Sequence, residues 1–489
     1  MDLVVTEALA DMIDRQEETL RLQELLRDGA PRMALLYGRR RVGKTYLLNH
    51  AWPRDEVFYF TASETTEAQN RIALLEELSR FRDEAVPEED YPTWRTVFRL
   101  LFDTRAPNPL VVVLDEFQYL GETLADVRRV ASDLNAVWEQ KRPARSFVVV
   151  ISGSHVKTME ALMAGGALFG RFNYTARIAP FNYWHAGQMT PYADLRDRVR
   201  SYAAFGGTPR YLAAIKTRDS LNASIPRLLL NAQGEVRTLI ETALIQERGL
   251  SDVSKYQALL RAIAMGSTLF SEIKSKAGLG DTAENGVRKM LEKLQDLCYV
   301  RGERNIGAKN TSPIRYRIDD PAFAFYYAFT ARYEAALARH DPRRIWADHI
   351  KVDFDGYIGH VFERVAEQAY KRLSTSLSLP IVREWGRWEG KDHAKKSLEM
   401  DIVAPLMDGR VMTGGVKWNT SPLTPQWHYH HMTMIERLRA SGVKWAHDAA
   451  DPNAPIIWVA AGGFSPEFEA AVRSERKDVY LWNLADLYR

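Results

Sequence analysis

Residues Gly38 to Thr45 have the types and the spacing of a phosphate-binding loop. The run Gly-Arg-Arg-Arg-Val-Gly-Lys-Thr fits G-x-x-x-x-G-K-[ST] without a gap. Gly38 and Gly43 let backbone N–H groups approach phosphate oxygens at the start of a helix, where the helix dipole also favours anions. Lys44 would reach the β- and γ-phosphates, and the hydroxyl of Thr45 would ligate Mg²⁺. We therefore expect a site for ATP or ADP here, with Tyr46, the next residue, among its contacts.

Two acidic residues, Asp115 and Glu116, directly follow the apolar run Leu110–Leu114. A short run of this kind is typical of a buried parallel strand. Asp115 would hold the Mg²⁺ shell, and Glu116 would act as general base by polarising the attacking water. Tandem Asp-Glu after a strand is typical of P-loop enzymes that hydrolyse ATP rather than of small GTPases. The alternative is that the two acids only cap the end of a strand.

Two further side chains are candidates for contact with the γ-phosphate. Ser152 follows the apolar run Phe147–Ile151, in a turn where a polar residue can contact the phosphate or position water. Arg171 could stabilise the charge on the γ-phosphate, either within its own chain or from a neighbouring subunit. The alternatives are a turn rich in small residues and an arginine that is solvated or salt-bridged.

The elements that must position these residues alternate along the chain. An amphipathic helix over residues 12–28 comes first, and short apolar runs separated by helical patterns follow it. Strands that alternate with helices indicate an α/β fold with a parallel sheet, here of the P-loop NTPase type. The strand-like runs are Met33–Tyr37, Val57–Phe60, Leu110–Leu114 and Phe147–Ile151.

The length of the chain predicts more than one domain. At about 150 residues per domain, 489 residues suggest roughly three. The apolar runs are far shorter than the ~20 residues that span a bilayer, and the first residues lack the pattern of a signal peptide. The single cysteine, Cys298, excludes an intramolecular disulfide and a cysteine-built zinc site. We therefore expect a cytoplasmic protein without a membrane partner.

Several short motifs occur along the chain in a specific order. They are Ile13-Asp14-Arg15, Tyr37–Thr45, Leu114–Gln118, Ser152–Ser154, Leu168–Arg171 and Phe205–Leu212. Together they resemble an archaeal and bacterial ATPase family of the AAA superclass, close to the STAND ATPases, over nearly the whole chain. The resemblance implies an AAA-type ATPase core, a helical lid, a winged helix and a C-terminal domain of the DUF234 kind. It also implies that Pro209 contacts the nucleotide from the lid, although the sequence Gly207-Thr208-Pro209 also fits a helix-breaking loop.

Composition changes along the chain in step with these modules. The net charge of +3 hides a basic segment, residues 254–317, which carries twelve Lys and Arg against six Asp and Glu. Eight of the twelve tryptophans lie from Trp346 onward. We expect an ATPase core over residues 1–185, a lid over 186–250, a winged helix over 251–320, a connecting helix over 321–345 and a C-terminal domain over 346–489.

The basic segment has the pattern of a winged helix-turn-helix, with three short helices and a hairpin. If it binds double-stranded DNA, its third helix would enter the major groove and its wing would contact phosphate. The alternative is a structural or protein-contact module. The candidate DNA contacts are Arg288, Lys289 and Lys293 on the third helix, with Arg301, Arg304, Lys309 and Arg315 on the wing.

The C-terminal segment resembles the restriction-endonuclease-like α/β fold, PD-(D/E)xK, which the family appends. That site needs an Asp on one strand and (D/E)-x-K on the next, so that two carboxylates hold Mg²⁺ beside a lysine. Asp401 and Lys417 are present, but the middle position is Gly415. Glu363 or Glu399 would have to supply the missing carboxylate, and Glu399 shares a strand face with Asp401. We expect a degenerate module that binds nucleic acid or protein, with an active nuclease as the alternative.

Histidines and tryptophans of this segment invite two simpler interpretations. His428, His430 and His431 lack the i,i+4 spacing of helical metal ligands, so we expect a solvated helix face. Four of the tryptophans would fill the core of the domain. These are Trp385, Trp388, Trp418 and Trp427.

Taken together, these features predict a Mg²⁺-dependent ATPase that works as a nucleotide-driven switch coupled to DNA or to a protein partner. A further expectation is a homo-oligomer that forms with ATP. The alternatives are a DNA-binding regulator that holds nucleotide without steady cycling, and an ATP-regulated nuclease.

Overall fold

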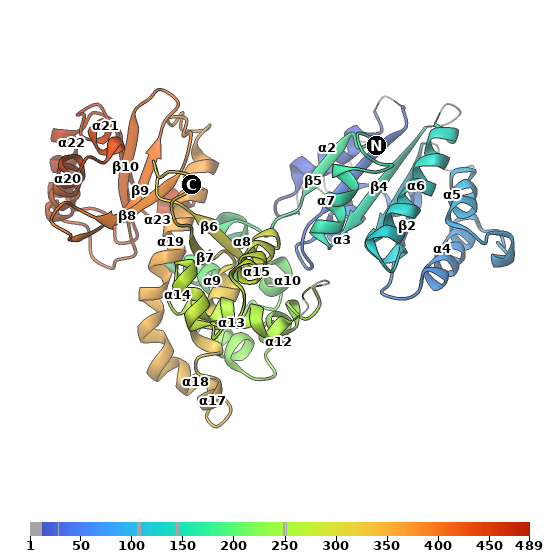
Figure 1. Ribbon diagram of the computed structural model, residues 1–489, viewed down its shortest axis with the longest axis horizontal. Coiled ribbons are helices and arrows are strands. Elements are labelled where there is room, and N and C mark those ends of the chain that lie inside the picture. The colour runs from blue at the N-terminus through green and yellow to red at the C-terminus, as the bar shows by residue number, and fades with distance from the viewer. Residues whose placement is uncertain (1–11, 28, 105–108, 143–145, 248–249, 251) are drawn as a thin grey trace. The chain divides into compact units, whose positions relative to one another are not determined.

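The computed structural model describes residues 12–27, 29–104, 109–142, 146–247, 250 and 252–489. The chain divides into two compact units, one ending at Pro180 and the other beginning at Phe181. Figure 1 shows both units with their helices and strands labelled. Among the described residues, no helix is both long enough and apolar enough to cross a membrane.

The first unit is built on a parallel sheet of five strands in the order β2-β3-β4-β1-β5. The predicted alternation of strands and helices is confirmed, and the fold is that of a P-loop NTPase. The edge strand β5 was not predicted, because its four residues form no apolar run. The strands are β1 (Arg32–Tyr37), β2 (Val57–Thr61), β3 (Leu110–Asp115), β4 (Phe147–Gly153) and β5 (Tyr174–Arg177).

Helices cover both faces of this sheet, because side chains along each strand point alternately to opposite sides. Met33 and Leu35 of β1 belong to one apolar core, and Ala34 and Leu36 belong to the other. The first core lies under α4 (Glu67–Arg82), α5 (Trp94–Phe102), α6 (Leu124–Lys141) and α7 (Val156–Ala164), and the second lies under α2 (Gln16–Glu24) and α3 (Lys44–Ala51). The sheet is therefore rigid, and the loops at its carboxyl ends rest on a fixed base.

The second unit begins with a helical segment and continues into three helices and a hairpin. The three helices and the hairpin follow the order expected of a winged helix, which is α13, α14, α15 and then the antiparallel strands β6 and β7. The first segment has α8 (Tyr183–Gln188), α9 (Leu195–Phe205), α10 (Pro209–Leu212), α11 (Leu221–Ile225) and α12 (Glu235–Ala243). The second has α13 (Val253–Ala264), α14 (Phe270–Lys276), α15 (Glu284–Asp296), β6 (Val300–Glu303) and β7 (Arg315–Ile318).

The segment predicted as one connecting helix over residues 321–345 consists of several pieces. They are α16 (Pro321–Phe325), a π-turn over Tyr326–Thr330, α17 (Glu334–Leu337) and α18 (Pro342–Ile345). Pro321 and Pro342 each stand at the first position of a helix, where the missing N–H is tolerated. The long helix of this region is α19 (Lys351–Leu373), which follows.

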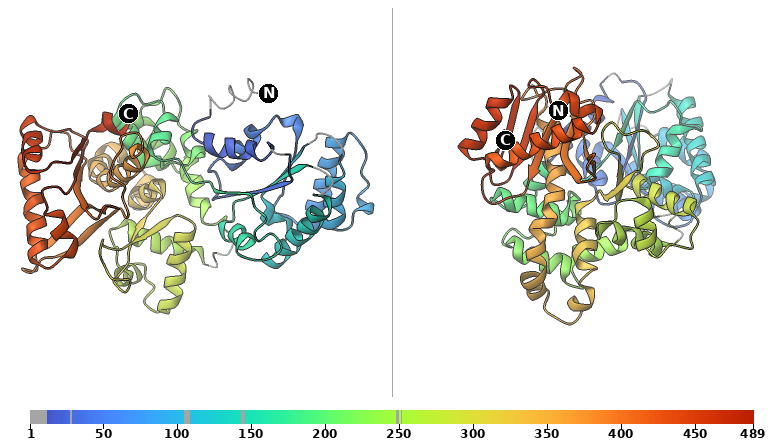
Figure 2. Two further views of the ribbon diagram at one scale, coloured as in Figure 1. Left: turned by 90° about the horizontal axis from the view of Figure 1, so that it is seen from above. Right: turned by 60° about the vertical axis from the view of Figure 1, so that its left-hand side comes forward.

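A mixed sheet of five strands forms the end of the chain, in the order β12-β11-β10-β9-β8. Strands β8, β9 and β10 pair antiparallel, whereas β10, β11 and β12 pair parallel. Figures 1 and 2 show α20, α21 and α22 on one face of this sheet and α19 on the other. The strands are β8 (Gly386–Lys391), β9 (Ser397–Pro405), β10 (Val411–Lys417), β11 (Ile456–Ala460) and β12 (Val479–Trp482). The helices are α20 (Pro425–Ala440), α21 (Lys444–Ala449), α22 (Pro466–Glu475) and α23 (Leu484–Leu487).

The tryptophans that fill this core are not the four that we predicted. Trp445 and Trp458 are buried in its two apolar clusters. By contrast, Trp427 is 43% exposed, and Trp385, Trp388 and Trp418 are half-buried. The prediction is confirmed in part for Trp388, which packs against one of these clusters. It was wrong for Trp427, because it counted aromatic residues without knowing which face each would occupy.

Candidate functional site

The phosphate-binding loop joins the end of β1 to the start of α3, as the motif requires. Gly43 has φ 95° immediately before α3, a backbone conformation that glycine adopts at little cost. A Cβ at Gly38 would lie 2.2 Å from the carbonyl oxygen of Ile178. The first glycine of the motif is therefore required by close backbone packing, in addition to any approach of phosphate.

Thr45 and Asp115, which lie seventy residues apart in sequence, meet at the carboxyl edge of the sheet. The hydroxyl of Thr45 donates a hydrogen bond to Oδ2 of Asp115 at 2.9 Å. Tyr59 of β2 donates a second one to the same oxygen at 2.8 Å. Burial and the neighbouring Asp115 carboxylate raise the pKa of Tyr59, so its hydroxyl keeps the proton that it donates. These oxygens fit a hard cation such as Mg²⁺, which prefers oxygen ligands.

The ammonium group of Lys44 lies inside the loop. It donates to the carbonyl oxygens of Gly38 at 2.8 Å and of Arg39 at 3.2 Å. Lys44 is buried, and its charge acts on Glu116 across the site. Tyr46 is the third residue of α3, and its exposed ring stacks on His50 with the ring centres 4.1 Å apart.

Glu116 lies at the end of β3 with φ 54°, a conformation that a non-glycine residue adopts at some cost. Ser154 donates to its Oε2 through both its hydroxyl, at 2.7 Å, and its backbone N–H, at 3.2 Å. The amide of Gln118 donates to the same oxygen. Burial raises the pKa of Glu116, but the charge of Lys44 and these hydrogen bonds outweigh it and hold the pKa below its usual value.

The serine that contacts Glu116 is Ser154. The predicted contact of Ser152 with the γ-phosphate or with water stays a prediction. Ser152 is fully buried within β4, and its hydroxyl has no hydrogen-bond partner among the described residues. Gly153 separates the two serines, and a Cβ there would lie 2.5 Å from the Gln118 amide oxygen. The glycine thus leaves room for Gln118 beside Ser154. The turn Ser152-Gly153-Ser154 therefore does supply a serine to the site, and this serine is its last residue.

Arg171 lies at the opposite edge of the sheet from the phosphate-binding loop. Its guanidinium pairs with Glu139 at 2.7 Å and lies 6.0 Å from the ring centre of Trp138. Trp138, near the end of α6, packs edge-on against Phe147, the first residue of β4. Because the loop and the two acids follow the carboxyl ends of the strands, Arg171 does not reach them within this unit. A contact supplied to a neighbouring subunit stays a prediction.

Three residues that the sequence analysis did not assign support the nucleotide loop. Tyr59 bonds with Asp115, as described. The hydroxyl of Tyr119 accepts a hydrogen bond from Arg40, the second arginine of the loop. Arg15, which is 7% exposed, donates to the carbonyl oxygen of Val42 at 3.4 Å. The run of three arginines in the motif was the available signal for such partners, but it does not say which side chains they meet.

The comparisons with known proteins agree with this geometry. A family model described as an ATPase domain predominantly from Archaea matches residues 12–215. A second family model, described as archaeal and bacterial proteins of unknown function, matches residues 326–427. A curated relative, the uncharacterized protein MJECL04 of Methanocaldococcus jannaschii, is 26% identical over 416 residues, 83% of this chain and 87% of that protein.

Solved structures similar to this chain include two archaeal nucleotide-binding proteins. The Walker-type ATPase PABY2304 of Pyrococcus abyssi is 21% identical, with a TM-score of 0.49, over 65% of this chain and 96% of that one. The ORC2 protein of Aeropyrum pernix, in ADPNP and ADP complexes, is 13% identical, with a TM-score of 0.42, over 66% and 95%.

In the second unit, the Gly207-Thr208-Pro209 turn begins a short helix. Pro209 is the first residue of α10, which fits the helix-starting role of proline. Gly207 accepts a backbone hydrogen bond from Phe181 at 2.8 Å, and a Cβ at Gly207 would lie 1.8 Å from the Phe181 carbonyl oxygen. The turn therefore has a structural role in its own unit. The contact of Pro209 with nucleotide stays a prediction.

The basic residues of the winged-helix segment have two different environments. On α15, Arg288 and Lys289 are exposed. Arg288 pairs loosely with Glu284 at 3.8 Å, and its guanidinium lies 4.1 Å from the ring centre of Phe270. Lys293 is half-buried further along the same helix. Two arginines of the wing, in contrast, have acidic partners within the protein. One of them, Arg301, pairs with Glu303 at 2.8 Å and with Glu367 of α19 at 3.5 Å.

The tip of the wing is packed against the C-terminal sheet. Ile306 is 4% exposed and belongs to the apolar core under α20 and α21. The side chain of Asn305 bonds with both the carbonyl oxygen of Glu389, at 2.7 Å, and its N–H, at 3.1 Å. Arg315 likewise pairs with Glu389 at 3.4 Å, so Arg301 and Arg315 both have acidic partners within the protein. Their contact with DNA phosphate stays a prediction. Arg304 stays at the surface, where it donates to Ser312.

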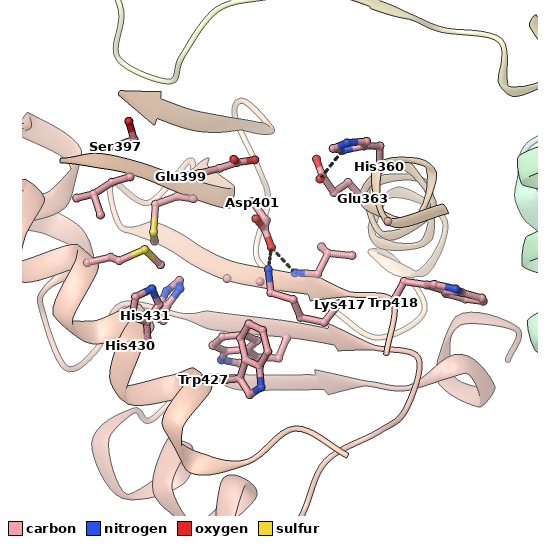
Figure 3. A pocket seen from close by; sticks show the side chains of 18 of the residues that line it. His360, Glu363, Ser397, Glu399, Asp401, Lys417, Trp418, Trp427, His430 and His431 are labelled. Carbon is pink, nitrogen blue, oxygen red and sulfur yellow. Dashed lines mark hydrogen bonds and ion pairs between the residues drawn. The ribbon is translucent and has the colours of Figure 1, made fainter. Parts of the chain in front are cut away.

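In the C-terminal domain, Asp401 and Lys417 lie together as predicted. Lys417 Nζ is 2.6 Å from Asp401 Oδ2, which also accepts from the N–H of Val416 at 2.9 Å. They line a cavity of about 630 Å³ between α19 and the sheet, which Figure 3 shows from close by. Glu363 and Glu399 line it as well, but both bond with Arg387.

The histidines of α20 are not the solvated face that we predicted. His428 and His431 are fully or almost fully buried, whereas His430 is exposed. Thr413 and Nε2 of His431 share a hydrogen bond at 3.0 Å, and His428 pairs with Glu475 at 3.0 Å. Among the described residues, no group of three or more His, Cys, Asp or Glu side chains is arranged to hold a metal ion.

Proposed function

We propose that this chain binds ATP with Mg²⁺, hydrolyses it, and uses the cycle as a conformational switch. The observation that carries the proposal is the 2.9 Å hydrogen bond between Thr45 and Asp115, at the mouth of the phosphate-binding loop. A hydroxyl at the end of the loop and a carboxylate at the end of the neighbouring strand are the two groups that hold Mg²⁺ in P-loop enzymes.

Each residue of the site has a distinct part in this proposal. Thr45 and Asp115 would hold the cation, which neutralises charge on the β- and γ-phosphates when bound. Lys44, on the inner side of the loop, would turn from the carbonyl oxygens of Gly38 and Arg39 to the phosphates. Because the loop surrounds its ammonium group, Lys44 would reach a bound phosphate from the position where it now donates to these carbonyl oxygens.

Glu116 is the base of the proposed reaction. Its three hydrogen-bond donors all reach Oε2, so Oε1 is the oxygen that accepts a proton from water. The water oxygen then bonds to the γ-phosphorus as the bond from this phosphorus to the β,γ-bridging oxygen breaks, giving ADP and phosphate. A pKa below the usual value keeps Glu116 ionised at neutral pH, which is the state that a base needs.

The partner of the switch is proposed on the exposed part of α15. Arg288 and Lys289 present two positive charges to solvent on one turn of a helix, where duplex DNA would supply phosphates. A protein partner, and an assembly of copies in which Arg171 meets a neighbouring nucleotide, belong to the same proposal. A regulator that retains nucleotide without cycling is the competing function.

Steady-state hydrolysis of ATP by the full chain tests the proposal. We expect Lys44→Ala to abolish nucleotide binding and turnover, with Lys216→Ala, an exposed lysine of the second unit, as its control. Glu116→Gln is expected to bind ATP but to hydrolyse it roughly 10²–10⁴ times more slowly, with the exposed Glu122→Gln as its control. Wild-type turnover by Glu116→Gln would show that the base is wrongly assigned. A single retained ADP, without multiple turnover by the wild type, would favour the regulator.

A further inference from the structure

Arg387 lies between two carboxylates that come from different elements of the C-terminal domain. It is the second residue of β8, and its Nη1 donates to Oε2 of Glu363, on α19, at 3.1 Å. Its Nη2 donates to Oε1 of Glu399, on β9. Arg387 is only 8% exposed and Glu363 is largely buried, so their pair is a buried one, whereas the side chain of Glu399 is 48% exposed. Buried pairs of this kind are costly to break from one side, because a charge is left without a partner.

The same cavity holds a third carboxylate, which also has a protein cation. Asp401 lines the cavity together with Glu363 and Glu399, as Figure 3 shows. Lys417 reaches its Oδ2 at 2.6 Å. The three acids are thus compensated by the side chains of Arg387 and Lys417. Burial raises the pKa of Glu363, but a hydrogen bond from His360 and the charge of Arg387 hold it below its usual value, so Glu363 is ionised.

The position where a fourth acid would stand is closed by an aromatic ring. Gly415 of β10 pairs in register with Trp458 of β11. A Cβ at Gly415 would lie 2.5 Å from the ring of Trp458. Trp458 is buried and its ring packs against Phe468 and His431, so a side chain at Gly415 would require this packing to shift. The residues therefore do not fit the two-carboxylate metal site that the resemblance implies.

The wing holds Arg387 from the other side. Ile306 donates its N–H to the carbonyl oxygen of Arg387 at 3.1 Å. The side chain of Ile306 packs against the backbone of Gly386. A Cβ at Gly386 would lie 2.7 Å from Cδ1 of Ile306, so only glycine leaves room for it. The arginine is thus fixed by backbone contacts as well as by its two acids.

We infer that Arg387 performs the charge-neutralising role of a divalent cation, so that the C-terminal pocket is a metal-free site held together by a guanidinium bridge between α19 and the sheet. The inference is independent of ATP hydrolysis in the first unit. It has a positive consequence: removal of the guanidinium leaves Glu363 and Glu399, which meet at its two terminal nitrogens, without their shared cation. These two carboxylates are hard oxygen ligands and would then take up a divalent cation whose shell water completes.

Binding of Mn²⁺ to the full, nucleotide-free chain tests the inference. Asp115→Asn is present in every sample, so that the first unit contributes no site. We expect no Mn²⁺ site, by electron paramagnetic resonance or calorimetry, in this background chain or with Arg410→Met, a control that breaks the pair of Arg410 with Asp408. Arg387→Met is expected to gain one site, and Glu363→Gln with Glu399→Gln is expected to remove it again.

Thermal unfolding keeps the test decisive if Arg387→Met folds poorly. Mn²⁺ should then restore a cooperative transition to Arg387→Met, because the cation binds only the folded form. Two results would overturn the inference. One is a chain with Arg387 intact that binds Mn²⁺ and no longer binds it after Glu363→Gln. The other is an Arg387→Met chain, folded or unfolded, that Mn²⁺ neither binds nor stabilises.

Discussion

The hydroxyl of Ser154 donates a hydrogen bond of 2.7 Å to the carboxylate of Glu116, and so joins the ends of two neighbouring strands. The backbone N–H of Ser154 donates to the same oxygen at 3.2 Å. The serine therefore fixes the direction of the proposed base and favours its ionised form. Replacing it changes both at once.

We expect Ser154→Ala to lower the turnover number and to give the reaction an acid limb. Glu116 has a pKa below 4.5 with its donors in place, so the rate should not fall for lack of ionised Glu116 between about pH 5 and pH 8. Without the hydroxyl, burial has a larger effect and raises the pKa, so the rate should begin to fall at a higher pH. Turnover measured against pH checks this, with the exposed Ser474→Ala as control. A flat profile in both variants would contradict it.

Gly38→Ala should damage the nucleotide loop more than its small change in volume suggests. The added Cβ would meet a backbone oxygen of Ile178 at 2.2 Å, and backbone cannot turn aside as a flexible side chain can. We expect a loss of about 1–3 kcal/mol in stability and a roughly tenfold or greater loss in ATP affinity. Gly165→Ala, where the new Cβ meets nothing within 4 Å, is the control. Equal melting temperatures and ATP affinities in the two variants would count against the close packing.

Arg171→Ala should leave the turnover of the monomer unchanged. The guanidinium pairs with Glu139 at 2.7 Å, at the sheet edge away from the loop, so it takes no part in hydrolysis within its own chain. The measurement is ATPase rate at a concentration where sizing shows a monomer. A loss of rate in that monomer would refute this placement. A loss only in an ATP-dependent oligomer would show that the arginine acts on a neighbouring subunit.

DNA binding, if α15 carries it, should depend on the helix and not on the wing. Arg288→Ala with Lys289→Ala removes two exposed charges, so the affinity should fall and the slope of log K against log salt should become shallower by roughly two. Arg304→Ala on the wing is the control, because it removes an exposed positive charge from the wing and leaves α15 unchanged. A larger effect of Arg304→Ala, measured by fluorescence anisotropy with duplex DNA, would reverse the assignment.

Buried His431 should make the second unit less stable in mild acid. Burial, with the nearby charges of His428 and Arg476, lowers the pKa of His431 from 6.5 to about 3 in the folded state. Between these values only the unfolded chain binds the proton, so the free energy of unfolding falls as the pH falls. The loss is about 1.4 kcal/mol for each pH unit below 6.5.

His431→Gln should reduce this pH dependence. Urea unfolding followed by tryptophan fluorescence at about pH 7 and about pH 5.5 measures it, because the ring of Trp458 lies 5.3 Å from that of His431. His430→Gln, at an exposed neighbour on the same helix, is the control. An unfolding midpoint of wild type that does not change with pH would contradict the prediction.

The nucleotide site could be predicted from the sequence because each of its motifs is contiguous. The loop from Gly38 to Thr45 and the acids Asp115 and Glu116 each follow one strand, and parallel strands bring their carboxyl ends to one edge. The Thr45–Asp115 contact follows from that rule. The choice of Ser154 over Ser152 does not, since it depends on the direction of a side chain after the strand has ended.

The surroundings of several other residues could not be predicted, for one physical reason. Arg171 follows a motif beside the site in sequence, but the chain returns along α7 to the far edge of the sheet before it reaches this residue. Arg301 and Arg315 have the charge of a DNA-binding wing, but their acidic partners lie in β6 and in distant elements. His428 and His431 are polar residues with buried partners. In each case the decisive contact is with a residue that sequence spacing does not identify.

Ile306 of the wing is packed in the core of the C-terminal sheet, and this limits where the second unit can be cut into stable fragments. A fragment that begins at residue 346, or at the family boundary of 326, would leave an empty space among Leu398, Ile435 and Trp445, where this isoleucine packs. Loss of a buried isoleucine alone costs about 2–5 kcal/mol, a large share of the stability of a small domain. A stable fragment of the C-terminal sheet should therefore include the wing.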